Sequence, residues 1–390
     1  MNNSDFFHDM KCQKHLFQLD ENHHYLNGAF LSPLLKSVEQ AGMDGVKMKN
    51  RPWEVTPDHF FKDSERVRSL FAELVHAENP ESVAILPSVS YGMGIVSKNL
   101  PVQKGGNIVF AGDQFPSNVY PWTRFCKENG CSLKIVEAPL EFQDRGRIWN
   151  EKILEAIDKD TILVALSNVH WTDGTLFDLE KIGEVARSRD AWFVIDGTQS
   201  VGAMPFDVQS VQPDALICAG YKWLMGPYGT ALGYFGERVR DGVPLEEGWI
   251  VRKNSCDFAG LVDYEEEYES GARRFDVGQR SNFINMPMMA KALEQILEWG
   301  PANIQEYCRE ISEEAIQKLR RQGFRIEDEK WRGAHLFGIY LPEKIDSEKV
   351  HKKLSENNIH VSVRGKAVRV SVNVYNTRED VERLSEVLVL

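Results

Sequence analysis

Short apolar runs alternate with longer amphipathic ones along most of this 390-residue chain. The short runs are rich in β-branched residues, which is typical of buried strands. They span 82–88, 106–112, 132–138, 161–169, 191–197, 214–220 and 230–236. Amphipathic helices are expected between several of them, at 91–100, 120–130, 150–160 and 179–190. The alternation predicts an α/β fold in which helices cover both faces of a mainly parallel, seven-stranded sheet.

The last third of the chain has a different pattern. A long helical tract spans 285–324 and is interrupted at Gly300-Pro301, and shorter strands and helices follow it. We therefore expect an N-terminal arm (1–20), a large domain (21–284) and a smaller α+β domain (285–390).

Composition excludes several classes of function. The net charge of −12 argues against nucleic acid as the main partner. Six scattered cysteines, with no metal-type clustering, suit a reducing compartment and predict neither disulfides nor a metal site. The first residues are polar, unlike a signal peptide, and there is no apolar run of about 18 residues. We expect a soluble cytoplasmic protein with no membrane partner.

Chemically useful residues follow the predicted strands, at the edge where parallel sheets bind ligands. Ser88, Val89 and Ser90 open a helix, whose free N–H groups can bind an anion. Asp196 directly follows an apolar strand, where a carboxylate is costly unless a cation meets it. Three further residues in such positions are Phe115, Asn168 and Lys222, the last on a glycine-rich loop.

Each of these residues has an ordinary structural explanation, but pyridoxal 5′-phosphate requires the whole set. Its aldehyde needs an amine, its pyridine nitrogen a carboxylate, its phosphate a helix N-terminus and its ring a flat partner. The sequence therefore predicts that Lys222 holds this cofactor covalently, opposite Asp196.

The chain also resembles the class V aminotransferase family of fold-type I pyridoxal-phosphate enzymes. The resemblance extends from YLNGAFLSP to VRVSVNVYNT, and the segments 196–199 (DGTQ) and 220–222 (GYK) carry it most specifically. The family includes cysteine desulfurases, selenocysteine lyases, kynureninases, isopenicillin N epimerase-like proteins and sulfoxide lyases. It implies a homodimer with a shared active site and a small amino-acid substrate.

The resemblance implies a role for each matching residue. Lys222 resembles the Schiff-base lysine, and Asp196 the partner of the pyridine nitrogen. The other implied cofactor contacts are Val89, Ser90 and Tyr221 with the phosphate, Phe115 with the ring, and Asn168 and Gln199 with the phenolic oxygen.

The remaining implied roles concern the substrate and the partner subunit. Arg369 resembles the arginine that binds the substrate α-carboxylate, and Asn27 and Gly28 match positions that line the substrate pocket. Gln279 is implied to reach the neighbouring subunit's phosphate, with Arg280 or Ser281 as alternatives.

The resemblance leaves the reaction open. Cysteine desulfurases carry a nucleophilic cysteine shortly before the tail arginine, and 360–371 holds none. Cys256, in a polar loop, does not match that position, so a desulfurase with a catalytic cysteine is not expected. After Lys222 removes the α-proton, we expect cleavage at Cβ, by a C–S or C–C lyase. Transamination and epimerisation are the alternatives, and a non-catalytic scaffold is disfavoured because the core residues are present.

Overall fold

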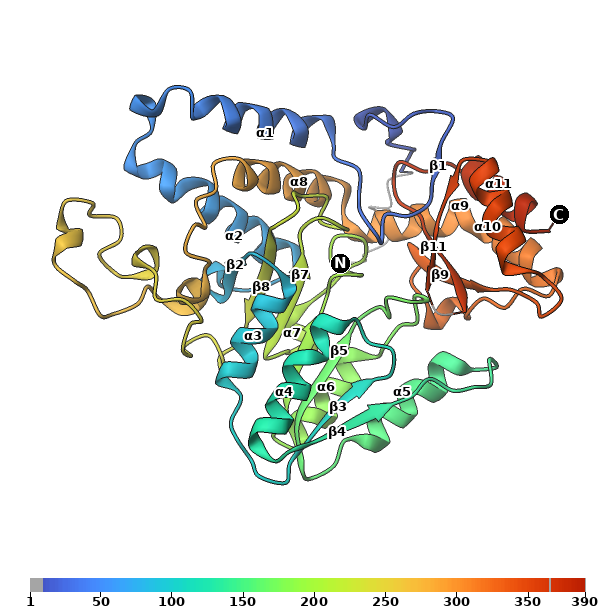
Figure 1. Ribbon diagram of the computed structural model, residues 1–390, viewed down its shortest axis with the longest axis horizontal. Coiled ribbons are helices and arrows are strands. Elements are labelled where there is room, and N and C mark those ends of the chain that lie inside the picture. Colours follow the sequence, from blue (N-terminus) through green and yellow to red (C-terminus); the bar gives the residue numbers. More distant parts are fainter. Residues whose placement is uncertain (1–9, 365, 390) are drawn as a thin grey trace, which may run out of the picture.

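A computed structural model of the protein describes residues 10–364 and 366–389, so residues 1–9 of the expected N-terminal arm lie outside it. Seven strands form one sheet in the order β2-β8-β7-β6-β5-β3-β4 (Figure 1). They are β2 (Val83–Leu86), β3 (Asn107–Ala111), β4 (Ser132–Val136), β5 (Thr161–Ser167), β6 (Trp192–Asp196), β7 (Ala215–Ala219) and β8 (Ala231–Phe235). Strand β8 alone runs in the direction opposite to the other six, so the expected mainly parallel seven-stranded sheet is confirmed.

Both faces of the sheet are buried. Successive strand residues point to opposite faces, and on β5 Val164 and Leu166 lie in one core while Leu163 and Ala165 lie in the other. The first core includes side chains of α2 (Lys62–Leu74), α5 (Arg145–Ala156), α6 (Leu179–Ser188) and α8 (Asn285–Trp299). The second includes side chains of α3 (Val89–Asn99) and α4 (Tyr120–Asn129). Because both faces are covered, the central strands β5, β6 and β7 are buried along their whole length and mainly apolar, whereas the edge strand β4 is partly exposed.

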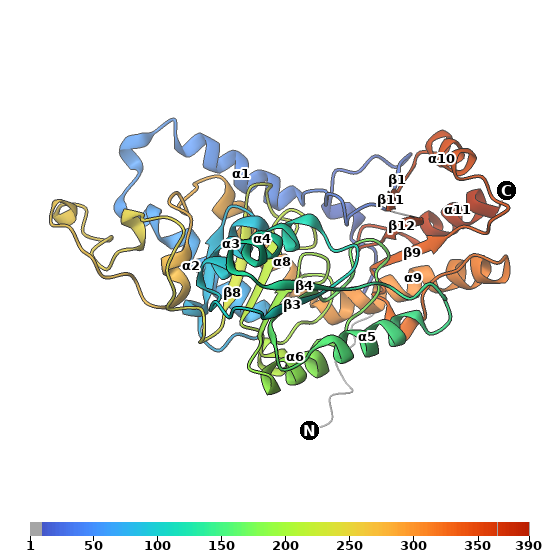
Figure 2. The same cartoon turned by 60° about the horizontal axis from the view of Figure 1, so that its bottom comes forward.

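Two helices that were not predicted from the sequence precede the sheet. They are α1 (Lys36–Met48) and α2, and both contact α8 (Figure 2). Gly42 and Gly45 bring α1 close to its neighbours. A Cβ at Gly42 would lie 2.7 Å from Sδ of Met288, and one at Gly45 would lie 2.2 Å from the carbonyl oxygen of Phe283. These glycines lower the helix propensity of α1, which explains why the pattern was missed.

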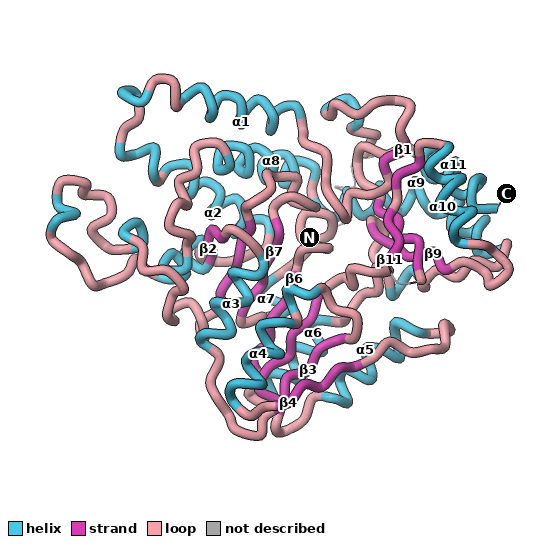
Figure 3. Tube along the Cα trace, viewed as in Figure 1, coloured by secondary structure: helices cyan, strands magenta, loops and turns pink. Residues whose placement is uncertain are grey.

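The C-terminal third forms a second, smaller sheet. Helix α8 ends at Gly300, whose φ of +76° suits glycine, and α9 (Pro301–Arg321) begins with proline, as the sequence predicted. Strands β9 (Leu336–Tyr340), β11 (Ser362–Arg364) and β12 (Ala367–Ser371) pair antiparallel, beside α10 (Ser347–Glu356) and α11 (Arg378–Val389) (Figure 3). The domain limits after residues 20 and 284 stay predictions.

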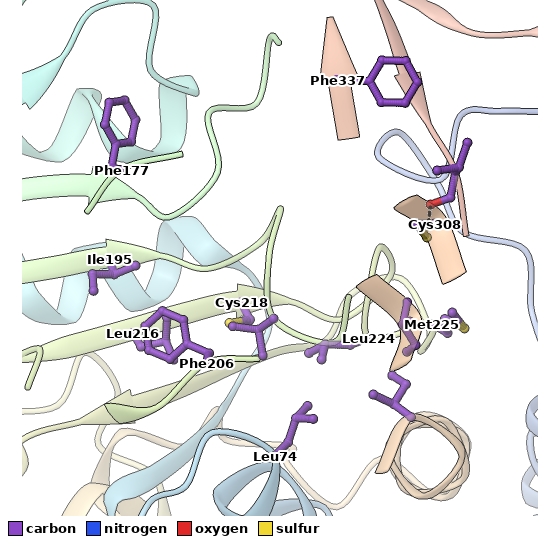
Figure 4. Close-up of a cluster of buried hydrophobic side chains, with 14 of the residues drawn as sticks. Leu74, Phe177, Ile195, Phe206, Leu216, Cys218, Leu224, Met225, Cys308 and Phe337 are labelled. Carbon is purple, nitrogen blue, oxygen red and sulfur yellow. Dashed lines mark hydrogen bonds between the residues drawn. The ribbon is translucent and has the colours of Figure 1, made fainter. Parts of the chain in front are cut away.

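The N-terminal segment crosses to this smaller sheet. Strand β1 (His24–Tyr25) pairs with β10 (Ile359–His360), and Asn27 forms a bridge with Ser371 of β12. The two parts also share one core, in which Leu216 and Cys218 of β7 lie in the same cluster as Cys308 of α9 and Phe337 of β9 (Figure 4). Nowhere within 10–364 and 366–389 is a helix both long and apolar enough to cross a membrane.

Candidate active site

A cavity of about 220 Å³ lies beyond the carboxyl ends of the parallel strands. Its walls come from segments that follow β2, β3, β5, β6 and β7, as the sequence predicted. The predicted site residues that line it are Val89, Ser90, Phe115, Asp196, Gln199, Tyr221 and Lys222. Asn168, Gln279, Arg369, Asn27 and Gly28 are not among its lining residues.

Lys222 enters this cavity from the turn that follows β7. Its side chain is buried, and Nζ lies 5.4 Å from the ring centre of Phe115 and 5.7 Å from that of Tyr221. Burial lowers the pKa of Lys222 to about 8, assisted by the positive charges of Arg369 and Arg364 and opposed by Asp196. A substantial fraction of this amine is therefore neutral near physiological pH.

Asp196 is a buried carboxylate without an ionic partner. It is the last residue of β6, is 5% exposed, and accepts a 3.0 Å hydrogen bond from the backbone N–H of Thr198. Among the described residues, no lysine, arginine or histidine nitrogen lies within 4.0 Å of it. Burial raises the pKa of Asp196, against the hydrogen bonds from Thr198 and the charge of Lys222. A cationic ligand group beside Asp196 would offset the free-energy cost of burying its negative charge.

The N-terminus of α3 supplies unpaired backbone N–H groups to the same cavity. Ser88 caps the helix, its Oγ accepting from the N–H of Tyr91 at 3.2 Å. Val89 and Ser90 form the first turn, and the hydroxyl of Ser90 lies 2.8 Å from that of Ser117. This end of the helix therefore suits an anion. Ser117 lines the cavity and was not identified from the sequence.

Aromatic rings form one wall. The rings of Phe115 and Trp171 form a T-shaped pair, with centroids 5.4 Å apart and planes at 83°. Tyr221 lies against Tyr228, with ring centroids 4.5 Å apart. Trp171 also lines the cavity and was missed, since it lies four residues beyond β5 in a turn that gives no strand-end signal.

The two predicted amides differ in their surroundings. Gln199 is held by its own chain, because its Nε2 donates to the carbonyl of Ala29 at 3.2 Å and its Oε1 accepts from Nε1 of Trp223 at 2.8 Å. The buried Oδ1 of Asn168 and Oγ of Ser167 have no hydrogen-bond partner. Of these two, only Ser167 lines the cavity, and it was not predicted as a site residue.

Arg369 lies on β12 with most of its donors free. The side chain is 1% exposed, Nη1 donates to the carbonyl of Trp171 at 2.8 Å, and Nε and Nη2 have no partner. Burial, followed by the charge of Arg364, lowers the pKa of Arg369 to about 9. Its free edge has the geometry that binds a carboxylate through two parallel hydrogen bonds.

Asn27 and Gly28 lie beside this strand. Oδ1 of Asn27 accepts from Oγ of Ser362 at 2.8 Å, and a Cβ at Gly28 would lie 2.7 Å from the hydroxyl of Tyr375. The structure thus brings both predicted residues next to the Arg369 strand.

The three residues predicted to cross to a partner subunit have different environments. Arg280 is buried and bonded to Asp276, and Oγ of Ser281 donates to the carbonyl of Phe60 at 2.6 Å. Gln279 is exposed and lines a second, larger cavity, of about 870 Å³. Of the three, only Gln279 therefore has a side chain that its own chain leaves free.

Known proteins resemble this chain over nearly its full length. A family model described as Aminotransferase class-V matches residues 50–384. The chain is 24% identical over 371 residues to an uncharacterized aminotransferase, YcbU, of Bacillus subtilis, covering 94% of each chain. It is 26% identical over 347 residues to a probable cysteine desulfurase of Methanothermobacter thermautotrophicus, covering 83% of this chain and 82% of the relative.

Solved structures share the fold. The cysteine desulfurase of Thermococcus onnurineus NA1 superimposes with a TM-score of 0.82 at 22% identity, covering 97% of this chain and 98% of the other. The cystine C–S lyase C-DES, in complex with cysteine persulfide, gives a TM-score of 0.80 at 18% identity, covering 95% and 98%.

These similarities weigh against one expectation. We did not expect a cysteine desulfurase because 360–371 lacks a cysteine, yet a relative and a solved structure carry that name. The absence of a cysteine from 360–371 is therefore not sufficient to exclude desulfurase activity.

Proposed function

The chain belongs to the class-V aminotransferase family, and from this we propose that it is a pyridoxal-phosphate-dependent enzyme acting on an amino acid. One observation supports the proposal most. A buried carboxylate without a cationic partner, Asp196, and a buried amine with a lowered pKa, Lys222, line the same cavity. Each is costly to keep in an apolar interior and becomes useful when a cationic heterocycle bearing an aldehyde lies between them.

The residues present fit this cofactor. We assign Asp196 to the pyridine nitrogen, Lys222 to the aldehyde, Phe115 to the ring, and the N–H groups of Val89 and Ser90 to the phosphate. When bound, the cofactor supplies an electron sink for negative charge at the substrate α-carbon. Further contacts proposed on the family resemblance are Tyr221, Asn168 and Gln199.

Arg369 and Lys222 handle the substrate in this proposal. Nε and Nη2 of Arg369, free in the structure, bind the α-carboxylate bidentately and fix the orientation of the α-carbon. Lys222, with a pKa of about 8, is basic enough to take the α-proton and neutral often enough to do so at physiological pH. Asn27 and Gly28, beside the Arg369 strand, complete the substrate side.

We place cleavage at Cβ, by a C–S or C–C lyase, first among the reactions. The fold-level likeness to a protein named as a cystine C–S lyase is in keeping with it. Transamination is the second candidate, since the YcbU relative is named as an aminotransferase. Epimerisation and desulfuration use the same residues up to the loss of the α-proton. A desulfurase would also need a thiol, and Cys256 is the exposed cysteine of the described chain.

We further propose a homodimer with a shared active site. Exposed apolar side chains, including Val46, Trp249 and Ile284, line the second cavity together with Gln279. Apolar surface of this kind is typical of a protein interface. A partner subunit there would place Gln279 where it can reach the phosphate of the other site.

The test is a panel of amino acids incubated with holoenzyme. A lyase releases a β-fragment over many turnovers, a transaminase needs a keto-acid acceptor, and an epimerase changes optical rotation alone. Loss of activity in a Cys256→Ser variant would indicate a desulfurase. Lys222→Ala should abolish both the visible absorbance of bound cofactor and turnover. Wild-type protein that takes up no added cofactor would overturn the proposal.

A further inference from the structure

Two arginines beside the cavity lack acidic partners. Within 10–364 and 366–389, no carboxylate oxygen lies within 4.0 Å of a guanidinium nitrogen of Arg364 or Arg369. The buried Nε of Arg364 has no hydrogen-bond partner, and its Nη1 donates only to the backbone carbonyl of the neighbouring Val363, at 2.8 Å. Together with Lys222, the region therefore has three cationic side chains.

The strand register places the two arginines on one face. In the antiparallel pair β11–β12, Ser362 lies opposite Arg369 and Arg364 lies opposite Ala367. Paired residues share a face, and so do residues two apart along a strand. Arg364 and Arg369 are thus diagonal neighbours on the same side of the small sheet.

Trp171 connects this face to the cavity. Its carbonyl accepts from Nη1 of Arg369, and its ring centre lies 5.7 Å from the guanidinium carbon of Arg364. The same ring meets Phe115, and both rings line the cavity that contains Lys222. Trp171 therefore lies between the cavity that contains Lys222 and the two arginines.

One carboxylate does not satisfy both guanidinium groups in this arrangement. The free edge of Arg369, Nε and Nη2, is a complete bidentate site for one carboxylate. Arg364 then keeps a buried Nε–H without an acceptor, which is costly, and its half-buried guanidinium group has no counter-ion among the described residues. A second anionic group on the ligand removes this cost.

We propose that the substrate is an amino acid whose side chain carries a second acidic group, and that Arg364 binds this group while Arg369 binds the α-carboxylate. The inference rests on the proposed function and narrows it to one substrate class, the acidic amino acids. Arg364 is in this view a specificity-determining residue.

The test uses acids that bind without reacting. Holoenzyme is titrated with succinate and with butyrate, which have four carbons each and differ in the second carboxylate. Wild-type protein should bind succinate about 10- to 100-fold more tightly, the value of a charge-assisted hydrogen-bond pair. Arg364→Gln should remove this preference without changing the affinity for butyrate, and Arg364→Lys should keep part of it. Lys366→Gln, which removes an exposed charge from the same hairpin, is the matched control and should keep it all.

Two results would overturn the inference. One is equal affinity of the wild-type protein for the two acids. The other is an Arg364→Gln variant that loses affinity for both equally, which would mean that the two arginines share one carboxylate. Neither measurement requires turnover, so cofactor uptake and the amino-acid panel test the proposed function separately. Circular dichroism of each variant, with Arg364→Lys as the milder change, separates loss of binding from loss of fold.

Discussion

At Asp196, burial outweighs the neighbouring charge. The carboxylate lies at the end of an apolar strand, its pKa is raised, and the Lys222 amine only partly opposes this shift. Burying a neutral residue of the same shape at this position would therefore cost less free energy in the apo-protein. The fold alone does not account for the carboxylate at this position, and the proposed cofactor would.

Replacing Asp196 by asparagine separates these roles. The variant should fold with unchanged or higher thermal stability in the absence of cofactor, since a buried charge is lost while the side-chain oxygen can still accept from Thr198. Holoenzyme turnover should fall about 100-fold or more, because the stabilising charge is missing when electrons move toward the ring. Calorimetry of the apo-protein and kcat of the holoenzyme are the two measurements. A large loss of apo-stability would show that the carboxylate is structural.

The pKa of Lys222 should respond to its neighbours in opposite directions. Removing a cation by Arg364→Gln or Arg369→Gln should raise it above about 8, toward the ordinary value of lysine, because repulsion of the ammonium form is lost. Asp196→Asn should lower it, since an attraction is lost. The shifts should be roughly a few tenths to one unit.

NMR titration of lysine-labelled apo-protein measures this pKa, with the Lys222 signal assigned by its absence from a Lys222→Met variant. The exposed-charge variant Lys366→Gln should leave the midpoint unchanged. A midpoint near 10.5 in the wild-type protein would contradict the environment described for this amine.

Sequence reasoning singled out residues at or just after strand ends that line the cavity, such as Asp196 and Lys222, because a polar group after an apolar run has a clear signal. It missed Trp171, Ser117 and Arg364. Trp171 reaches the cavity through a turn in which its Nε1 donates to the carbonyl of Asp113 at 2.6 Å, a contact 58 positions away in the sequence. Arg364 comes to lie on the same face as Arg369 only because β11 pairs with β12, and the sequence around Arg364 does not reveal this pairing.

At the scale of elements, one of the two edges of the large sheet is covered by the side chains of Arg68 and Asp276 and the backbone of Val277. Strand β2 lies at that edge, and its outward N–H at Ile85 donates to Oδ1 of Asp276 at 2.7 Å. The carbonyl of Val83 accepts from Arg68, and the carbonyl of Ile85 accepts from the N–H of Val277 at 2.9 Å. Covering the edge satisfies its backbone groups and prevents pairing with other chains.

Asp276→Asn should destabilise the protein by about 3–5 kcal/mol, because the fully buried Arg68 loses its buried counter-ion and keeps only the partly exposed Glu65. Urea unfolding of the apo-protein measures this cost. The matched control is Glu128→Gln in the exposed Arg124–Glu128 pair, which should change the free energy of unfolding by less than about 1 kcal/mol. Equal effects at the two positions would mean that the buried pair contributes no more than a surface pair.

The elements of the large sheet were predictable because most of its strands are buried apolar runs beside amphipathic helices, with the partly exposed edge strand β4 as the exception. All seven strands occur within the expected ranges, and the interruption at Gly300-Pro301 occurs where glycine and proline indicated it. Helices α1 and α2 were not predicted, because their stability depends on packing against α8 rather than on local helix propensity. Tertiary contacts of this kind leave little trace in a single segment.

At the scale of the whole molecule, the proposed homodimer with a shared active site predicts complementation between inactive variants. In a mixture of Lys222→Ala and Gln279→Ala chains, half of the dimers are mixed, and one of the two sites in each has both residues intact. The mixture should regain about a quarter of wild-type activity, more than either variant alone. Activity after subunit exchange, with sedimentation to establish the dimer, measures this. No gain on mixing would show that Gln279 does not act across subunits.

The pairing of β1 with β10 sets the order in which the protein can be completed during synthesis. His23 and His360, beside this pair, are 337 positions apart, so the first strand has no partner until almost the entire polypeptide has left the ribosome. The part of the cavity that contains Lys222 and Asp196 can assemble earlier, from contiguous segments, as domains do on nascent chains. Strand β12, which carries Arg369, joins last, so translation that stops short of residue 359 leaves the amine and the carboxylate in place but supplies no Arg369.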